Sequence, residues 1–180
     1  RECRRIKPQS NRAMKIIFLD IDGVILTRRT MIANGRNWSA AKPDPVLCQT
    51  LIRCCEKGDV RIVVSSTWRD TPIKCRAKLK EGGLLNCLHK SWATPLDTQL
   101  SPGGIYIGVT RGLEISAWLL AHPTITDFRI LDDEEHDFKT DPEFYDKLLL
   151  CDTNNGADYY VMARLVDSAG AERRMTCQQT

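Results

Sequence analysis

Three short, largely apolar runs, each followed at once by acidic or hydroxyl residues, constrain the fold of this chain more than any other feature. They cover residues 15–19, 60–64 and 128–131. Runs of this length that are rich in β-branched residues, with little polar alternation, indicate strands buried on both faces. Strands of that kind belong to parallel sheets that helices cover on both sides. The three runs therefore predict an α/β chain with a buried sheet.

Helical patterns between these runs support the same fold. Asp44 and Pro45 supply an N-cap and a first-turn proline for a helix, and Gly58 is placed to end it. Residues 84–109 lack such a pattern and are expected to form loops with a short strand at 105–109. The remaining expected elements are helices over 72–80, from Thr110 onward and over 157–166, and a fourth strand at 148–151. This alternation of strands and helices predicts a three-layer, Rossmann-like fold with a central parallel sheet.

Composition places the chain among ordinary globular proteins. It has 180 residues, of which 42% are hydrophobic and 27% charged, and such a length fits a single domain. No apolar run approaches the roughly 20 residues that span a bilayer, and no signal-peptide pattern opens the chain. We therefore expect no membrane association and a cytoplasmic location. The eight cysteines include no pair at metal-binding spacing and are expected to be buried thiols in a reducing environment.

The basic charge of the chain is confined to its first 13 residues. The net charge of +3 combines +4 in residues 1–13 with −1 in residues 14–180. The first segment has no apolar periodicity and ends just before Met14, which would open directly on the first strand. We interpret residues 1–13 as a flexible basic arm or an added leader, and residues 14–180 as a single domain. The alternative is a nucleic-acid-binding arm, since basic N-terminal segments bind phosphate backbones.

Polar side chains gather where the three apolar runs end. They are Asp20, Asp22, Ser65, Ser66, Asp132 and Asp133. Because the carboxyl ends of parallel strands lie at one edge of a sheet, where open α/β folds bind ligands, these side chains are expected to converge. Four carboxylates in one crevice repel one another unless a cation lies between them, and their oxygens suit Mg²⁺. Each residue alone could form a turn or a helix cap, but six at three strand ends make that explanation weak.

The same positions resemble the motifs of the haloacid dehalogenase-like (HAD) superfamily. Residues 18–24, FLDIDGV, are similar to its first motif, an apolar run followed by D-x-D-G-[VT]. Residues 62–65, IVVS, look like the second motif, and residues 130–133, ILDD, look like the acidic fourth motif. The third motif, a Lys or Arg at a helix start, is best matched by Arg111. The resemblance covers the chain from about Met14 to Asp137.

This resemblance implies a phosphatase that forms an aspartyl-phosphate. Asp20 would attack phosphorus, which splits one displacement into two steps. Asp22 would protonate the leaving-group oxygen and later deprotonate the hydrolytic water. The cofactor would be Mg²⁺, held by the Asp20 carboxylate, the Asp22 backbone carbonyl and either Asp132 or Asp133.

The resemblance also implies residues that bind the phosphoryl group. Ser65 is expected to donate a hydrogen bond to a phosphoryl oxygen, and Arg111 to neutralise charge on the transferred group. Two alternatives stay open. Ser66 would be the donor if the strand runs one residue longer, and Arg69 could take the role of Arg111. Trp68 is expected to pack against the sheet rather than to stack on a base.

The spacing of the motifs leaves little room for a cap domain over the site. About 36 residues separate Gly23 from the second strand, and about 40 separate Trp68 from Thr110. We therefore expect a fold with a minimal cap or none, as in relatives that act on macromolecules or on protruding ends. The loop at 27–38 contributes three arginines that would draw an anionic substrate toward the site, namely Arg28, Arg29 and Arg36.

The resemblance narrows further at two places. SSTWR at residues 65–69 and RGLEI at residues 111–115 resemble small phage and bacterial HAD members associated with RNA-repair proteins. The leading hypothesis is a Mg²⁺-dependent phosphomonoesterase whose substrate is an RNA or DNA end or a nucleotide. The alternatives are a small-metabolite phosphatase, and a phosphate-binding regulatory or partner-binding module with little turnover. Binding alone would not require Asp22, which favours the enzyme.

Overall fold

A computed structural model describes residues 14–57, 60–96, 98–100 and 106–170 of the chain, so the predictions for residues 1–13 and for Gly58 lie outside it. A five-stranded sheet runs through the centre, in the order β3-β2-β1-β6-β7, and all four pairings are parallel. The strands are β1 (Lys15–Leu19), β2 (Val60–Val64), β3 (Leu88–Ala93), β6 (Asp127–Asp132) and β7 (Leu148–Leu150). The predicted three-layer fold with a central parallel sheet is confirmed.

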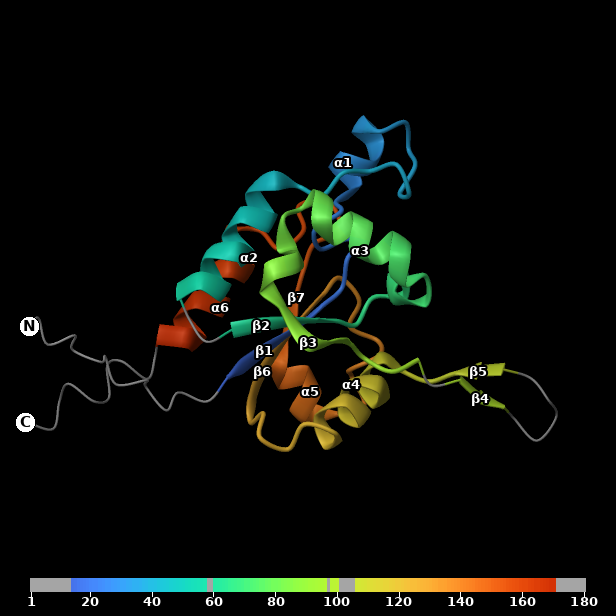
Figure 1. Cartoon of the computed structure of the whole chain (residues 1–180), viewed down its shortest axis with the longest axis vertical. Coiled ribbons are helices and arrows are strands. Elements are labelled where there is room, and N and C mark those ends of the chain that lie inside the picture. Colours follow the sequence, from blue (N-terminus) through green and yellow to red (C-terminus); the bar gives the residue numbers. More distant parts are fainter. Residues whose placement is uncertain (1–13, 58–59, 97, 101–105, 171–180) are drawn as a thin grey trace, which may run out of the picture.

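Helices cover both faces of this sheet (Figure 1). One face packs against α2 (Pro45–Lys57), α3 (Pro72–Glu81) and α6 (Tyr159–Gly170), and the other against α4 (Arg111–Leu120) and α5 (Pro142–Lys147). The side chains of β1 alternate between the two cores, because successive residues of a strand point to opposite faces. Burial on both faces explains why β1, β2 and β6 have largely apolar sequences.

The predicted start of α2 is confirmed. The Asp44 carboxylate accepts hydrogen bonds from the backbone amides of Val46 and Leu47, at 2.9 and 3.3 Å. These two amides have no partner within the helix, so the cap satisfies them. The helices expected over 72–80, after Thr110 and over 157–166 correspond to α3, α4 and α6, and the strand expected at 148–151 corresponds to β7.

The expectation that residues 84–109 are mostly loops is wrong. They contain a 3₁₀ turn, η2 (Leu84–Cys87), and then β3, whose sequence is LHKSWA. β3 lies at the edge of the sheet and, among the strands that the structure describes, pairs with β2 alone, in an interrupted register. An edge strand is partly exposed to water and tolerates polar residues, so no continuous apolar run marked it. A two-stranded antiparallel ribbon follows, with β4 (Thr98–Leu100) paired to β5 (Tyr106–Gly108), the latter within the expected strand at 105–109.

Two inserted segments flank the carboxyl edge of the sheet. The first contains the helix α1 (Arg28–Ala33), which the sequence did not predict; Thr27 and Thr30 form its capping box. The second is the ribbon of β4 and β5, which extends away from the rest of the molecule (Figure 1). Among the described residues, neither segment is a cap domain of independent size, in agreement with the expected minimal cap. No helix in the described ranges is long and apolar enough to cross a membrane.

Candidate active site

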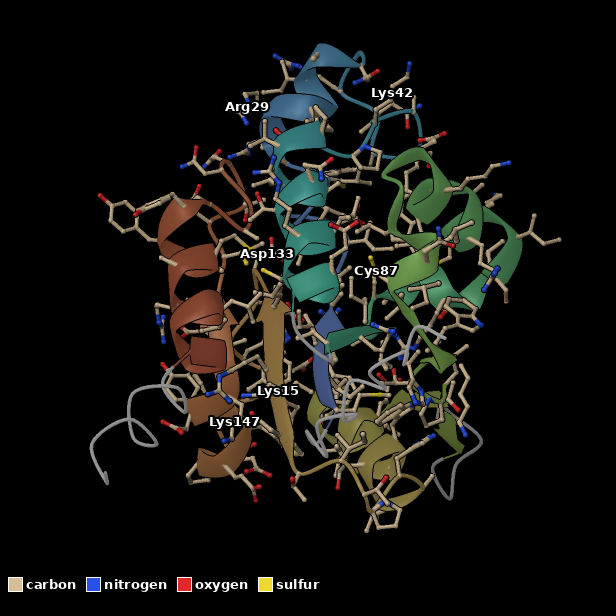
Figure 2. The ribbon with its side chains drawn as sticks, turned by 60° about the vertical axis from the view of Figure 1, so that its left-hand side comes forward. Lys15, Arg29, Lys42, Cys87, Asp133 and Lys147 are labelled. Carbon is tan, nitrogen blue, oxygen red and sulfur yellow. The ribbon has the colours of Figure 1, made fainter. Side chains whose placement is uncertain are left out.

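The carboxyl ends of β1, β2 and β6 bring the predicted site residues together. Leu19 is in register with Val64 of β2 and Leu131 of β6, so Asp20 follows β1 between the two neighbouring strand ends. Its backbone amide donates to the carbonyl of Leu131 at 2.9 Å. Figure 2 shows Asp133 beyond the end of β6, while Lys15 lies toward the opposite edge of the sheet. The predicted convergence is therefore seen in the fold.

Three carboxylates form a compact group at this edge. Asp20, Asp132 and Asp133 each offer one carboxylate oxygen, and these oxygens lie within 4.8 Å of one another. Asp20 is 5% exposed and Asp132 fully buried. Burial, followed by the charge of Asp132, raises the pKa of Asp20 to about 8, although nearby Arg111 acts in the opposite direction. Burial also raises the pKa values of Asp132 and Asp133. The ionised cluster is thus electrostatically unfavourable by itself.

A divalent cation fits this donor set. Clustered carboxylate oxygens are ligands that hard cations such as Mg²⁺ prefer, and an ion between them would offset the repulsion that raises these pKa values. The side chain of Asp133 is held by Thr153, whose hydroxyl donates to its Oδ2 at 2.9 Å. Thr153 was not found from the sequence, because it lies in a turn after β7 that only the fold brings beside β6.

Gly23 lets the chain turn closely past Asp133. Its φ of +69° lies in the left-handed region, and a Cβ at this position would come within 1.9 Å of Asp133 Oδ2. Only glycine adopts this conformation without strain and leaves the space for the carboxylate. The close turn of the backbone at Gly23 therefore makes room for the Asp133 carboxylate.

Asp22 lies beside the acidic group and is held by Trp68. The Trp68 indole Nε1 donates to Asp22 Oδ2 at 2.9 Å, whereas Oδ1 is buried without a hydrogen-bond partner among the described residues. Burial raises the pKa of Asp22, and the Trp68 hydrogen bond opposes this. The Trp68 ring packs partly against the core, as expected. Its contact with Asp22 was not predicted.

The two serines after β2 differ in their surroundings. The Ser66 hydroxyl forms a hydrogen bond with the Asp20 carboxylate, which lowers the pKa of Asp20. The Ser65 hydroxyl is buried and has no hydrogen-bond partner among the described residues. Of the two phosphate donors predicted, Ser66 is thus the one in contact with Asp20.

The two candidate arginines also occupy different environments. Arg111 Nη1 lies 3.3 Å from Asp20 Oδ1 and forms an ion pair with Asp132. Its own backbone amide donates to the Asp137 carboxylate at 3.4 Å, which anchors the start of α4. The charges of Asp20 and Asp132 raise the pKa of Arg111, against the effect of burial. Arg111 therefore lies where a transferred phosphoryl group would need a cation.

The partners of Arg69 lie outside the group of three carboxylates. It is 4% exposed, pairs with Glu114 of α4, and donates from Nη1 to the carbonyl of Ser66 at 2.7 Å and to that of Ser65. These contacts join the end of β2 to α4. Sequence reasoning did not identify Glu114, although it follows Arg111 by three residues on the same helix.

The three arginines expected to attract substrate are not equivalent. Arg29 pairs with Asp44 at 2.9 Å, the same carboxyl group that caps α2. Arg28 and Arg36 are exposed. In Figure 2, Arg29 lies beyond the carboxyl edge of the sheet, on the same side as Asp133. The local positive charge at this end is therefore carried by Arg28 and Arg36 more than by Arg29.

Comparison with known protein families agrees with this geometry. Residues 16–158 match the HAD domain in Swiss Army Knife RNA repair proteins. No curated protein and no solved structure matches the sequence significantly. The matched range contains the five described strands of the central sheet except for Lys15, the carboxylates of the site and Arg111. The chain belongs to the family of HAD domains found in Swiss Army Knife RNA repair proteins.

Proposed function

We propose that this protein is a Mg²⁺-dependent phosphomonoesterase that acts on a nucleic-acid end or a nucleotide. One observation carries the proposal: Arg111 lies against Asp20 and Asp132, at the edge of the sheet where Asp133 completes a group of three carboxylates. Membership of a HAD family associated with RNA repair supports both phosphoryl chemistry and a nucleic-acid substrate.

Asp20 and Asp22 carry out different parts of the proposed reaction. A carboxylate oxygen of Asp20 attacks phosphorus as the bond from phosphorus to the leaving oxygen breaks, and Asp22 gives its proton to that oxygen. Water then attacks the aspartyl-phosphate, Asp22 takes up the proton, and inorganic phosphate leaves with the Asp20 carboxylate restored. The Trp68 hydrogen bond at 2.9 Å fixes one oxygen of Asp22, which leaves the other oxygen for the proton transfer.

Charge on the transferred group is balanced by neighbouring donors. Arg111 supplies a guanidinium beside Asp20, and Ser66 a hydroxyl on the same carboxylate. Asp20, Asp132 or Asp133 and the carbonyl of Asp22 would hold Mg²⁺, which supplies electrostatic stabilisation of the phosphoryl oxygens when bound. Positioned cations and donors of this kind provide most of the catalysis in phosphoryl transfer.

The openness of the site favours a substrate larger than a small metabolite. The described segments between the strands include one short helix, α1, and one ribbon, β4 and β5, neither of which is a closed cap. A protruding phosphorylated end can approach such a site, whereas small-metabolite phosphatases generally need a cap to enclose their substrate. A small metabolite remains the alternative substrate that the assay must test.

A binding module with little turnover is the second alternative function. Asp22 argues against it, because a phosphate-binding site needs no half-buried carboxylate with one buried oxygen that has no partner among the described residues. The cost of burying such a group is expected where it takes part in proton transfer.

The decisive assay measures phosphate release with Mg²⁺ and with EDTA. The substrates are 3′-phosphorylated, 5′-phosphorylated and 2′,3′-cyclic oligonucleotides, mononucleotides and sugar phosphates, each with wild type and Asp20→Asn. We expect Mg²⁺-dependent release from an oligonucleotide or nucleotide, abolished by Asp20→Asn. Release in EDTA, or full activity of Asp20→Asn, would contradict the mechanism. Activity confined to sugar phosphates would contradict the substrate class and leave the chemistry intact.

A further inference from the structure

An open pocket lies near the site, at the carboxyl end of the edge strand β3. Its volume is about 370 Å³, within the range of small-molecule pockets. We call it the β3 pocket. It is lined by Arg69, Pro72, Lys90, Ser91, Trp92, Ala93, Thr94 and Leu96. None of these residues takes part in the phosphoryl chemistry described above, so the pocket needs an explanation of its own.

Two buried polar atoms of this pocket have no hydrogen-bond partner among the described residues. They are the hydroxyl of Thr94, a residue only 3% exposed, and Nε of Arg69, whose other nitrogens are engaged by Glu114 and by backbone carbonyls. Buried polar groups are rarely left without a partner. Both atoms are also closed to solvent, so they mark a polar floor beneath the pocket, and a ligand would meet the side chains that line it more openly.

The wall of the pocket combines an aromatic ring with positive charge. Trp92 is half-buried, and the Arg76 guanidinium lies over its ring at 5.5 Å from the centroid. Lys90 is exposed, and none of the described residues that line the pocket is acidic. Aromatic faces that bind stacked bases, flanked by cations that contact phosphates, are the usual means of binding single-stranded nucleic acid.

The pocket is joined to the catalytic edge of the sheet through its floor. The Thr94 backbone amide donates to the carbonyl of Val64, the last residue of β2, at 3.0 Å. Arg69 donates to the carbonyl of Ser66, and the Ser66 hydroxyl contacts Asp20. A nucleic-acid end whose phosphate lies at Asp20 would therefore have the β3 pocket beside it, along the carboxyl ends of the strands.

We propose that the β3 pocket binds a nucleobase of a single-stranded polynucleotide whose phosphorylated end lies at Asp20. The base takes the place of the Arg76 guanidinium over the Trp92 ring, and the adjoining phosphates contact Lys90 and the displaced Arg76. This inference rests on the proposed function for the position of the phosphate, but the binding of the base can be measured without turnover.

Binding is tested with Asp20→Asn as the parent, so that the substrate persists. Fluorescently labelled trinucleotides of RNA and of DNA, phosphorylated at the 3′ or the 5′ end, are titrated while anisotropy is followed. Adding Trp92→Ala should weaken binding roughly tenfold, since stacking on one aromatic residue is worth 1–3 kcal/mol per base. Trp92→Phe keeps a ring and should restore most of the affinity. Comparing the RNA and DNA probes identifies the sugar preference.

Lys90→Ala and Lys147→Ala form a matched pair of lysine substitutions. Lys90 lies at the rim of the pocket, whereas Lys147 ends α5 at the far edge of the sheet (Figure 2). Lys90→Ala should weaken binding and reduce its salt dependence, because one phosphate contact is lost. Lys147→Ala should leave both unchanged. This pair keeps the test valid if Trp92→Ala lowers the folding stability.

Measurements of turnover distinguish a failure of the inference about the β3 pocket from a failure of the proposed function. In the otherwise wild-type enzyme, Trp92→Ala should lower the ratio of kcat/KM for the trinucleotide to that for p-nitrophenyl phosphate, again roughly tenfold. Binding that depends on Trp92 without phosphate release would support the pocket and contradict the proposed function. The opposite result would be phosphate release with an unchanged ratio of the two kcat/KM values and an unchanged trinucleotide affinity in Trp92→Ala and Lys90→Ala. It would overturn the inference about the β3 pocket and leave the proposed function intact.

Discussion

At the scale of single residues, the hydrogen bond from Trp68 to Asp22 links the packing of the fold to its chemistry. Trp68→Phe removes the donor and keeps a ring against the core. Asp22 then loses the contact that orients its carboxylate, so we expect kcat to fall roughly tenfold with a smaller change in KM. Steady-state kinetics with p-nitrophenyl phosphate measure both constants.

Trp118→Phe is the matched control for this substitution. It removes an indole hydrogen bond of similar length, 3.0 Å to the carbonyl of Ser91, on the other side of the sheet. Both variants should lose about 1 kcal/mol of folding stability. Only Trp68→Phe should lower kcat; an equal loss in both variants would mean that the effect is on stability rather than on Asp22.

Gly23 allows a test of the acidic group without changing any carboxylate. In Gly23→Ala the new Cβ would lie 1.9 Å from Asp133 Oδ2, so the carboxylate must move away. We expect the Mg²⁺ concentration for half-maximal activity to rise at least roughly tenfold, the usual order of loss when a ligand's support is removed. The measurement is a Mg²⁺ titration of phosphate release.

Gly35→Ala separates backbone strain from displacement of Asp133. Gly35 has a similar φ of +72°, but nothing lies within 4 Å of its added Cβ. Both variants carry the left-handed penalty of about 1–2 kcal/mol. If Gly35→Ala raised the Mg²⁺ requirement as much as Gly23→Ala, displacement of the carboxylate would not be the cause.

At the scale of elements, Arg69, in the 3₁₀ turn after β2 (Thr67–Asp70), and Arg111, at the start of α4, have different roles. Arg69 ties the end of β2 to α4 through Glu114, and Arg111 faces the carboxylates. Arg69→Met would leave Glu114 buried without its partner, so we expect a loss of about 3 kcal/mol of folding stability. In thermal unfolding this corresponds to roughly 6–12 °C for a chain of this size.

Arg111→Met provides the comparison. With Mg²⁺ present it should lower phosphate release far more than it lowers the unfolding temperature, since the cation still offsets the charge of the carboxylates. Arg69→Met should show the reverse pattern. A stable but inactive Arg69→Met would instead assign Arg69 to the phosphate, the alternative that the sequence left open.

The strands and helices also show how much of this fold could be predicted from the sequence. β1, β2 and β6 are covered on both faces, so burial alone dictates apolar runs, and their ends could be found with the residues that follow them. β3 has one neighbour and a polar sequence, and it was missed. The helix α1 was missed because its capping box consists of two threonines, without the acidic or amide residue that usually marks one.

Within the site, the predictable residues were those adjacent to a strand end or a helix start. Asp20, Asp132 and Arg111 follow directly from where the elements stop or begin. Thr153 and Glu114 act through other side chains, on Asp133 and Arg69, across 20 and 45 positions of the chain. Such partners depend on the directions of side chains in the folded state, which no local sequence pattern indicates.

At the scale of the whole molecule, the acidic group predicts a link between cation binding and stability. Folding brings oxygens of two buried carboxylates and of the half-buried Asp133 within 4.8 Å of one another, and Arg111 pairs with two of the three. A cation that binds the folded state alone stabilises it by mass action, about 2.7 kcal/mol at a hundredfold excess over the dissociation constant. We therefore expect Mg²⁺ to raise the unfolding temperature by about 5–10 °C relative to EDTA.

The variants Asp133→Asn and Asp146→Asn test whether this stabilisation arises at the site. Asp133 belongs to the group, whereas Asp146 is an exposed residue of α5 at the far edge of the sheet. Each removes one negative charge, so a general effect of ionic strength would act equally on both. Asp133→Asn should lose most of the Mg²⁺-induced shift, while Asp146→Asn should retain it. Since no substrate is present, equal shifts in the two variants would refute the metal site itself, whatever the enzyme hydrolyses.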